Sequence, residues 1–86
     1  MPACYEVRFT HQAVKDLKKL NPKLRDKVKK YCFEILSLEP QIGKKLKGDL
    51  EGSYSLRLSY TDRLVYSIDF NKKIVYVERC RTHYGE

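Results

Sequence analysis

The sequence predicts an α+β fold in which a helical hairpin packs on one face of a four-stranded, mainly antiparallel sheet. One strand-like segment near the N-terminus precedes two helix-like segments, and three strand-like segments follow them. This order, β-α-α-β-β-β, keeps the helices apart from most of the strands, as is typical of α+β domains. A chain of 86 residues has the length of one domain, which we expect to span residues 1–86.

The first strand is predicted from the segment CYEVRF, residues 4–9. Tyr5, Val7 and Phe9 recur at every second position, so they would share one face of a half-buried strand. Thr10 follows directly, and threonine is preferred at the N-cap of helices. We therefore expect a helix to begin after Thr10.

Two antiparallel helices joined by a tight turn are predicted next. Ala13, Leu17 and Leu20 recur at the spacing of one helix face. Asn21-Pro22 should end the first helix and begin the second, because proline is favoured at the first helical position. Glu39-Pro40 should end the second helix. The apolar stripe expected on that helix consists of Leu24, Val28, Tyr31 or Cys32, Ile35 and Leu38.

A basic connector, residues 41–53, leads to the last three strands. A short turn at residues 60–62 should join the first two of these strands, and Asn71-Lys72 fits a two-residue hairpin loop before the third. The apolar positions that alternate along the first two are Tyr54, Leu56, Leu58, then Leu64, Tyr66, Ile68 and Phe70. Arg57 and Arg63 alternate with them, so both should project from the face opposite the helices.

The chain is basic, with 18 Lys and Arg against 11 Asp and Glu and a net charge of +7. A field of this sign attracts polyanions, so nucleic acid or an acidic protein is the expected partner. No apolar run approaches the ~20 residues of a membrane span, and the N-terminus lacks a signal-peptide pattern, so we expect a cytoplasmic protein. Three cysteines without metal-ligand spacing favour free thiols over a disulfide or a metal site, and no cofactor is expected.

The C-terminal segment ERCRTHYGE, residues 78–86, carries groups that can bind phosphate and transfer protons. Arginines there could stabilise charge on a phosphoryl group, His83 could exchange a proton near neutral pH, and Tyr84 could stack on a base. With Arg57 and Arg63 they would match RNA cleavage by the 2′-hydroxyl, which needs a base, cationic groups and an acid for the leaving oxygen. The alternative interpretation is a frayed polar tail.

Lysines form two further groups of candidate RNA contacts. One group lies in the first predicted helix and the other in the connector, where contacts to phosphate are easily made. Lysines on a helix are, alternatively, a solvated face. The two groups are Lys15, Lys18 and Lys19, and Lys44, Lys45 and Lys47.

Four segments together resemble the RelE/ParE superfamily of bacterial toxin–antitoxin toxins: FTHQAVKDLKKL, KKLKGDLEGSYSLRL, DRLVYSID and RTHY. They follow the family's order over essentially the whole chain, and the end CRTHYGE is most similar to the YoeB/Txe branch of RelE-type mRNA interferases. The resemblance implies a RelE-like fold and an endoribonuclease that cuts mRNA in the A site of the 70S ribosome, inhibiting translation. It also implies neutralisation by a cognate antitoxin, and it leaves homodimerisation open.

The resemblance implies roles for individual residues. Arg63 matches the arginine that contacts the scissile phosphate, His83 matches the general acid of the YoeB branch, and Tyr84 matches the tyrosine beside it. Arg57 falls where the RelE branch has a basic residue, whereas Ser55 stands in place of another. The expected catalytic set is Arg57, Arg63, Arg81, His83 and Tyr84, and the expected RNA or ribosome contacts are Lys15, Lys18, Lys19, Lys44, Lys45, Lys47 and Arg79.

One position departs from the YoeB branch, which has a glutamate general base in the connector. The matching position here is Lys44, and the nearest acidic residues, Asp49 and Glu51, lie a few residues downstream. The resemblance therefore assigns no general base. Two alternatives share the fold: a ParE-like toxin that poisons DNA gyrase by binding, and a degenerate toxin that acts only as a basic binding module.

Overall fold

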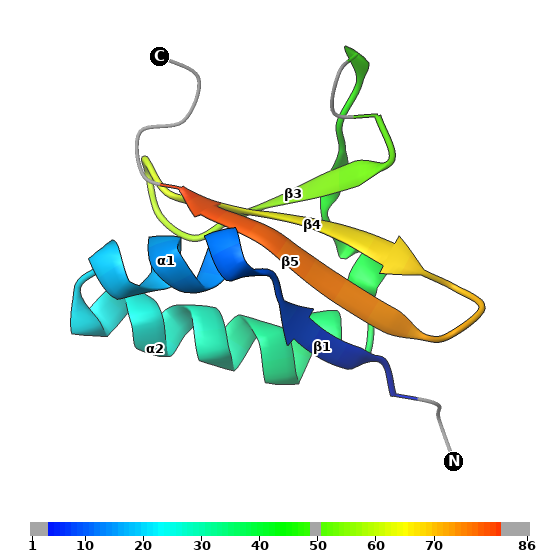
Figure 1. Ribbon diagram of the computed structural model, residues 1–86, viewed down its shortest axis with the longest axis horizontal. Helices are drawn as coiled ribbons and strands as arrows, with labels where there is room; N and C mark the ends of the chain where they lie inside the picture. Colours follow the sequence, from blue (N-terminus) through cyan, green and yellow to red (C-terminus); the bar gives the residue numbers. More distant parts are fainter. Residues whose placement is uncertain (1–3, 49–50, 82–86) are drawn as a thin grey trace.

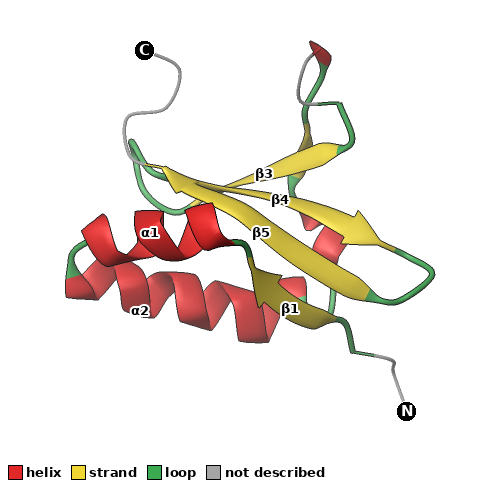
Figure 2. Cartoon of the chain, in the orientation of Figure 1, coloured by secondary structure: helices red, strands yellow, loops and turns green. Residues whose placement is uncertain are grey.

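The structure is a computed structural model that describes residues 4–48 and 51–81 (Figure 1). Its elements are β1 (Glu6–Phe9), α1 (His11–Lys19), α2 (Pro22–Tyr31), β2 (Lys44–Lys45), β3 (Ser53–Arg57), β4 (Arg63–Asp69) and β5 (Ile74–Arg81). A π-helical turn, Cys32–Leu36, extends α2, and a 3₁₀ turn, Pro40–Ile42, precedes β2. Both helices lie on one side of the sheet, which confirms the predicted α+β class (Figure 2).

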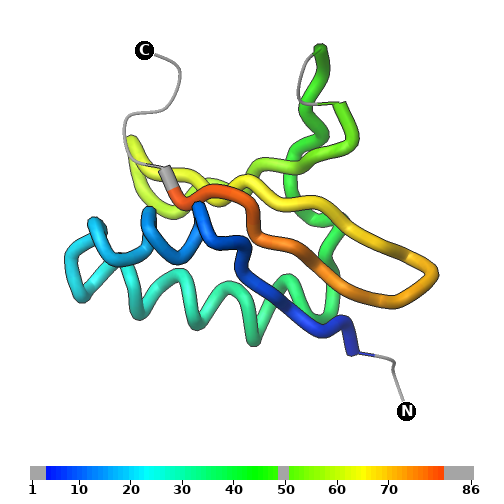
Figure 3. Tube along the Cα trace, in the orientation of Figure 1, coloured from blue at the N-terminus to red at the C-terminus, as the bar shows by residue number. Residues whose placement is uncertain are grey.

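The strands form one five-stranded sheet in the order β1-β5-β4-β3-β2. β1 runs parallel to β5, beside which it lies in Figure 3, and the other neighbours are antiparallel. The sheet has one strand more than predicted, because Lys44 and Lys45 pair with β3 at its edge. Two lysines carry no apolar alternation, so the connector contains no strand signal.

Both predicted helix starts are confirmed by their caps. The Thr10 hydroxyl accepts a hydrogen bond from the backbone N–H of Ala13 at 3.2 Å, and the Asn21 side chain accepts one from Leu24 at 2.8 Å. Pro22 occupies the first turn of α2, where its missing N–H has no intrahelical partner to lose. Each cap satisfies one otherwise unpaired donor and fixes where its helix begins.

The predicted apolar stripe of the second helix is wrong at its C-terminal end. Leu36 is fully buried, whereas Leu38, which the stripe included, is 52% exposed. The cause is the π-helical turn Cys32–Leu36, whose wider turns keep residues four apart on one face. Val28, Cys32 and Leu36 therefore point together into the core.

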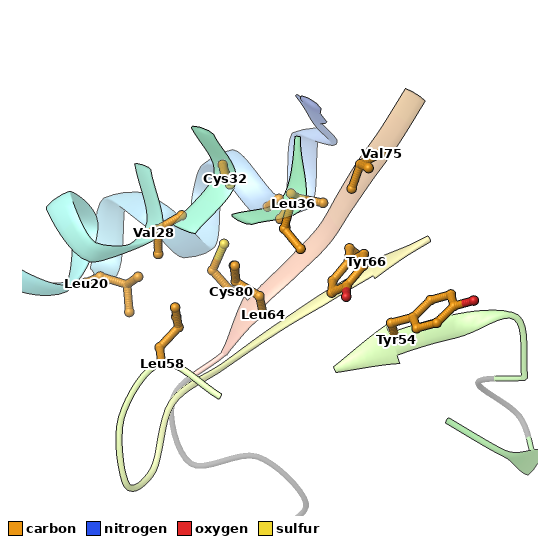
Figure 4. Close-up of a cluster of buried hydrophobic side chains, with 12 residues drawn as sticks. Leu20, Val28, Cys32, Leu36, Tyr54, Leu58, Leu64, Tyr66, Val75 and Cys80 are labelled. Carbon is orange, nitrogen blue, oxygen red and sulfur yellow. The ribbon is translucent and has the colours of Figure 1, made fainter. Parts of the chain in front are cut away.

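The hydrophobic core fills the space between the helical hairpin and the sheet (Figure 4). The side chains of the sheet that join this core include the alternating ones expected from sequence, such as Tyr54, Leu64 and Tyr66, whereas Val65 is buried on the opposite face. Cys32 and Cys80 are free and buried, and burial raises the pKa of each thiol to about 12, so both are protonated at neutral pH. Within residues 4–48 and 51–81, no helix has the length and apolarity that crossing a bilayer requires.

A β-bulge at Glu78 sets the orientation of side chains along β5. Val65 pairs with Arg79 whereas Tyr66 pairs with Val77, so Glu78 is an extra residue between two regular ladders. Val77 and Cys80 consequently both face the core, although they lie three positions apart. Without the bulge, strict alternation would place Arg79 and Arg81 on the face of Val77.

The loop between β4 and β5 differs from its prediction. Asp69 pairs with Ile74, so the loop comprises residues 70–73 instead of the two-residue turn at Asn71-Lys72. The Asp69 side chain accepts a hydrogen bond from the backbone N–H of Lys72 at 3.0 Å, and Lys73 takes a positive φ of 58°. The aspartate stabilises the longer loop locally, as such residues do in turns.

Candidate active site

Three arginine positions lie in register across three neighbouring strands of the sheet. Arg57 of β3 lies directly opposite Arg63 of β4, and Arg63 lies directly opposite Arg81 of β5. Directly paired positions of antiparallel strands are about 5 Å apart at their Cα atoms and share a face. We call this set the arginine row. It confirms that Arg57 and Arg63 project from the face opposite the helices.

The arginine row is held in register by the loop between β3 and β4. The backbone N–H of Leu58 donates to the carbonyl of Asp62 at 2.8 Å. The Ser59 hydroxyl donates to the Asp62 carboxylate at 2.6 Å and accepts from the Asp62 N–H at 3.1 Å. These bonds close the loop directly beside Arg57 and Arg63.

Like charges directly opposite one another destabilise a sheet, so an anion bound at Arg57 and Arg63 would stabilise this part of it. The ion pairs within the described residues join Arg8 to Glu6 and Arg79 to Asp16. Arg57 is exposed and belongs to neither pair. A surface of this kind can bind phosphate through several guanidinium donors at once.

Lys44 adds a further cation next to the arginine row. It pairs with Ser55, the residue two positions before Arg57 on β3, and therefore lies on the same face. Ser55 in turn pairs with Val65, which pairs with Arg79. These four positions form a second line across the sheet. It runs parallel to the arginine row and lies two residues away from it along each strand.

Arg79 is engaged by α1. Its Nε donates to the Asp16 carboxylate at 2.9 Å, and the backbone N–H of Cys80 donates to the same carboxylate at 3.1 Å. Burial alone would raise the pKa of Asp16, but hydrogen bonds from Arg79, Gln12 and Cys80 outweigh it and hold that pKa below its usual value. Arg79 thus ties the edge of β5 to α1, and its contact with RNA stays a prediction.

Glu78 is a polar residue of the open face that no sequence pattern singled out as a candidate site residue. Its carboxylate accepts hydrogen bonds from the hydroxyl of Ser53 on β3 at 3.1 Å and from that of Ser67 on β4 at 3.0 Å. The carboxylate therefore lies over three adjacent strands, on the face that carries the arginine row. The available signal was an alternation that fails at Glu78, since Val75, Val77 and Cys80 cannot share a face on a regular strand.

The connector is held against the sheet by Tyr66. Its hydroxyl donates to the carbonyl of Pro40 at 2.6 Å and accepts from the backbone N–H of Gly43 at 3.0 Å. The Tyr66 ring stacks on that of Tyr54 with a centroid distance of 5.4 Å, and burial raises the pKa of Tyr66 to about 12. These contacts position β2, and with it Lys44.

The remaining predicted lysines do not join the arginine row. Lys15, Lys18 and Lys19 are exposed on α1, in the helical layer. Lys45 and Lys47 line a groove of about 470 Å³ whose apolar lining includes Ile68 and Phe70. As RNA or ribosome contacts, these lysines stay predictions.

His83 and Tyr84 lie outside the described residues. Arg81 is placed by its backbone pairing with Arg63, and His83 follows two positions later in the sequence. The structure therefore brings together Arg57, Arg63 and the Arg81 position. The roles of His83 and Tyr84 stay predictions.

The chain is similar to known bacterial toxins over nearly its whole length. Residues 7–85 match the family model of the ParE-like toxin of type II bacterial toxin–antitoxin systems. Toxin RelG of Mycobacterium tuberculosis is 42% identical over 76 residues, which cover 87% of this chain and 86% of RelG.

Solved structures show the same fold. The toxin–antitoxin complex RelBE2 of M. tuberculosis contains a chain that is 38% identical with a TM-score of 0.86, covering 96% of this chain and 95% of that one. The isolated RelE toxin of Escherichia coli is 31% identical with a TM-score of 0.78, covering 95% and 87%. The YoeB–YefM complex of Staphylococcus aureus contains a chain that is 30% identical with a TM-score of 0.75, covering 93% and 98%. The chain belongs to the ParE-like toxin family of type II bacterial toxin–antitoxin systems, within the RelE/ParE superfamily.

Proposed function

We propose that this toxin is a ribosome-dependent endoribonuclease that cleaves mRNA in the ribosomal A site and so inhibits translation. The arginine row is the observation that carries the proposal, because the guanidinium groups of Arg57 and Arg63 are directly paired on adjacent strands, with the backbone of Arg81 paired beside Arg63, and such groups stabilise a phosphoryl group that gains charge. A toxin that acted only by binding a protein would not need this row. A cognate antitoxin, such as those in the RelBE and YoeB–YefM complexes, would neutralise the toxin.

The reaction follows from the chemistry of RNA. The 2′-oxygen attacks the adjacent phosphorus, the bond to the 5′-oxygen breaks, and the products are a 2′,3′-cyclic phosphate and a 5′-hydroxyl. Arg57, Arg63 and Arg81 would stabilise the charge on the phosphoryl oxygens. His83 would donate the proton that the 5′-oxygen takes up, and Tyr84 would position the substrate.

Cleavage is tested in a purified translation reaction by primer extension on a defined mRNA. We expect Arg57→Ala and Arg63→Ala to lower the single-turnover rate by about 10²-fold each, since removal of one donor to a developing oxyanion has effects of that order. Arg8→Ala is the matched control, because Arg8 lies at the β1 edge and pairs with Glu6 at 2.7 Å. Its rate should stay within about threefold of the wild type, since exposed ion pairs contribute little.

A gyrase supercoiling assay separates the alternatives. Intact mRNA in the presence of active ribosomes, together with loss of supercoiling, would overturn the proposal in favour of a gyrase poison. Intact mRNA, unaffected gyrase and normal growth on expression without antitoxin would indicate a degenerate toxin. Cleavage that depends equally on Arg8 and on Arg63 would remove the arginine row from the mechanism.

A further inference from the structure

The open face bears few carboxylates that could accept a proton from RNA. Along the strands of the described residues, Glu6 is paired with Arg8 at the β1 edge, and Asp69 accepts from Lys72 at the far end of β4. Glu78 lies between these two on β5, and its hydrogen-bond partners are the hydroxyls of Ser53 and Ser67. Glu78 is thus a carboxylate on this face whose side-chain hydrogen bonds come from neutral hydroxyls, and no Arg or Lys forms an ion pair with it within the described residues.

The bulge determines where the Glu78 carboxylate lies. Because Glu78 is the extra residue between the Val65–Arg79 and Tyr66–Val77 pairs, it turns out of the core ladder while Val77 and Cys80 keep their buried positions. Bulges re-aim side chains in this way and are common next to active sites. Glu78 is half-buried, in contrast to the fully buried Val77 beside it.

The carboxylate is held as a preorganised acceptor. The Ser53 hydroxyl donates to one of its oxygens at 3.1 Å, and the Ser67 hydroxyl donates to the other at 3.0 Å. The two serines are directly opposite each other on β3 and β4, so the carboxylate of β5 spans three strands. Fixing the group in one orientation lowers the reorganisation that proton transfer would otherwise require.

Glu78 lies within one nucleotide's reach of the arginine row. Its carboxylate accepts hydrogen bonds from Ser53 and Ser67, which lie four residues, about 13 Å of strand, from the paired Arg57 and Arg63. Side chains on strands lean along the strand direction, and arginine is long, so the guanidinium groups can approach the carboxylate more closely than the backbone positions do. A phosphate on the arginine row would thus place its neighbouring ribose towards Glu78.

We propose that Glu78 is the general base of the RNA cleavage reaction, an inference that rests on the proposed endoribonuclease function. Its carboxylate takes the proton of the 2′-hydroxyl while the 2′-oxygen forms its bond to phosphorus. The bond from phosphorus to the 5′-oxygen breaks, and that oxygen receives a proton from an acid, His83 in the proposed mechanism. The proton gained by Glu78 is then released to water, so the enzyme returns to its starting state.

Glu78→Gln tests the proposal, because the amide keeps the size of the side chain and an oxygen acceptor but cannot take up the proton. We expect the single-turnover rate of mRNA cleavage to fall by about 10²-fold or more, as for loss of a general base. The concentration of programmed ribosomes that gives half of the maximal rate should stay the same. Glu78→Asp, which keeps a carboxylate, should retain an intermediate rate.

Ser67→Ala distinguishes catalysis from a merely structural role. It removes one of the two hydroxyls that hold Glu78 but leaves the carboxylate, so its rate should stay within about tenfold of the wild type. Equal losses in Ser67→Ala and Glu78→Gln, or a Glu78→Gln rate within about threefold of wild type, would overturn the assignment while leaving the nuclease intact. A wild-type protein that cuts no mRNA would overturn the proposed function as well. If Glu78→Gln does not melt cooperatively, the cleavage rates of Glu78→Asp and Ser67→Ala are compared instead. A general base predicts the larger loss of rate in Glu78→Asp, because that substitution displaces the carboxylate, whereas Ser67→Ala leaves it in place.

Discussion

Replacing Tyr66 by phenylalanine should measure how strongly the connector is held to the sheet. The substitution removes the hydroxyl that donates to the Pro40 carbonyl at 2.6 Å and accepts from the Gly43 N–H at 3.0 Å. Both partners are backbone groups that would lose their bond, and an unsatisfied buried group costs about 1–3 kcal/mol. Pro40 is buried, whereas Gly43 is half-buried and can bind water instead. We therefore expect the free energy of unfolding to fall by about 2 kcal/mol.

Urea denaturation monitored by circular dichroism gives this free energy. The midpoint should fall with little change in slope, because the surface exposed on unfolding is nearly the same. For a domain of this size, ~2 kcal/mol corresponds to a melting temperature lower by about 10 °C. Tyr54→Phe is the matched control: Tyr54 stacks on Tyr66 at 5.4 Å, and its hydroxyl makes no hydrogen bond within residues 4–48 and 51–81. A loss no larger in Tyr66→Phe than in Tyr54→Phe would refute the anchoring role of the Tyr66 hydroxyl.

Three further changes test the same structure. Asp16→Asn removes the carboxylate that accepts from Arg79 and Cys80, and urea titrations should give a loss of about 1–2 kcal/mol. Because the pKa of Asp16 is lowered in the folded protein, its contribution is present above the unfolded pKa and lost as pH falls, so the wild type and the variant should converge in acid. Gly43→Ala would place a Cβ 2.2 Å from the Tyr66 hydroxyl and should cost about 1–3 kcal/mol, but less in a Tyr66→Phe background, as a double-mutant cycle would show. Asn21→Ala should lower stability by about 1 kcal/mol through loss of the α2 cap, measured against an exposed Lys23→Ala control.

Local patterns in the sequence predicted most elements of the fold. Thr10 and Asn21 identify helix starts because their side chains bond the first free N–H groups, a contact that needs no tertiary partner. Alternation identified β1, β3 and β4, since one of their faces packs on the helices. The parallel pairing of β1 with β5 brings together residues from the two ends of the chain, and a local pattern carries no information about it.

The errors arose where the backbone departs from regular geometry. Leu36 replaces Leu38 in the core because a π-helical turn changes the spacing of one helix face. The arginine row was predicted in part, as Arg57 and Arg63 follow from the period of two on regular strands. Glu78 was missed because a bulge, which depends on the pairing of β5 with β4, moves it to the open face.

Two single-residue deletions in β5 would test the bulge directly. Each deletion shortens β5 by one residue, so that a single residue remains opposite Tyr66 and the ladder continues to the Val65–Arg79 pair without a bulge. Deleting Glu78 keeps Val77 opposite Tyr66, so the core and the arginine row should both persist. The deletion removes the bonds to Glu78 from Thr10, Ser53 and Ser67, and we expect a loss of about 2–4 kcal/mol with cooperative unfolding.

Deleting Val77 is the matched control, because it leaves the same chain length and the same ladder but places Glu78 opposite Tyr66 in the core. Losing a fully buried valine costs about 1.5–3 kcal/mol, and burying a carboxylate without a partner costs several more. Since domains of this size are stable by only about 5–10 kcal/mol, this variant should fail to fold. Thermal melts followed by circular dichroism compare the two. Equal stability of the two deletions would show that Glu78 is not the extra residue, and its carboxylate would then not be placed on the face of the arginine row by the bulge.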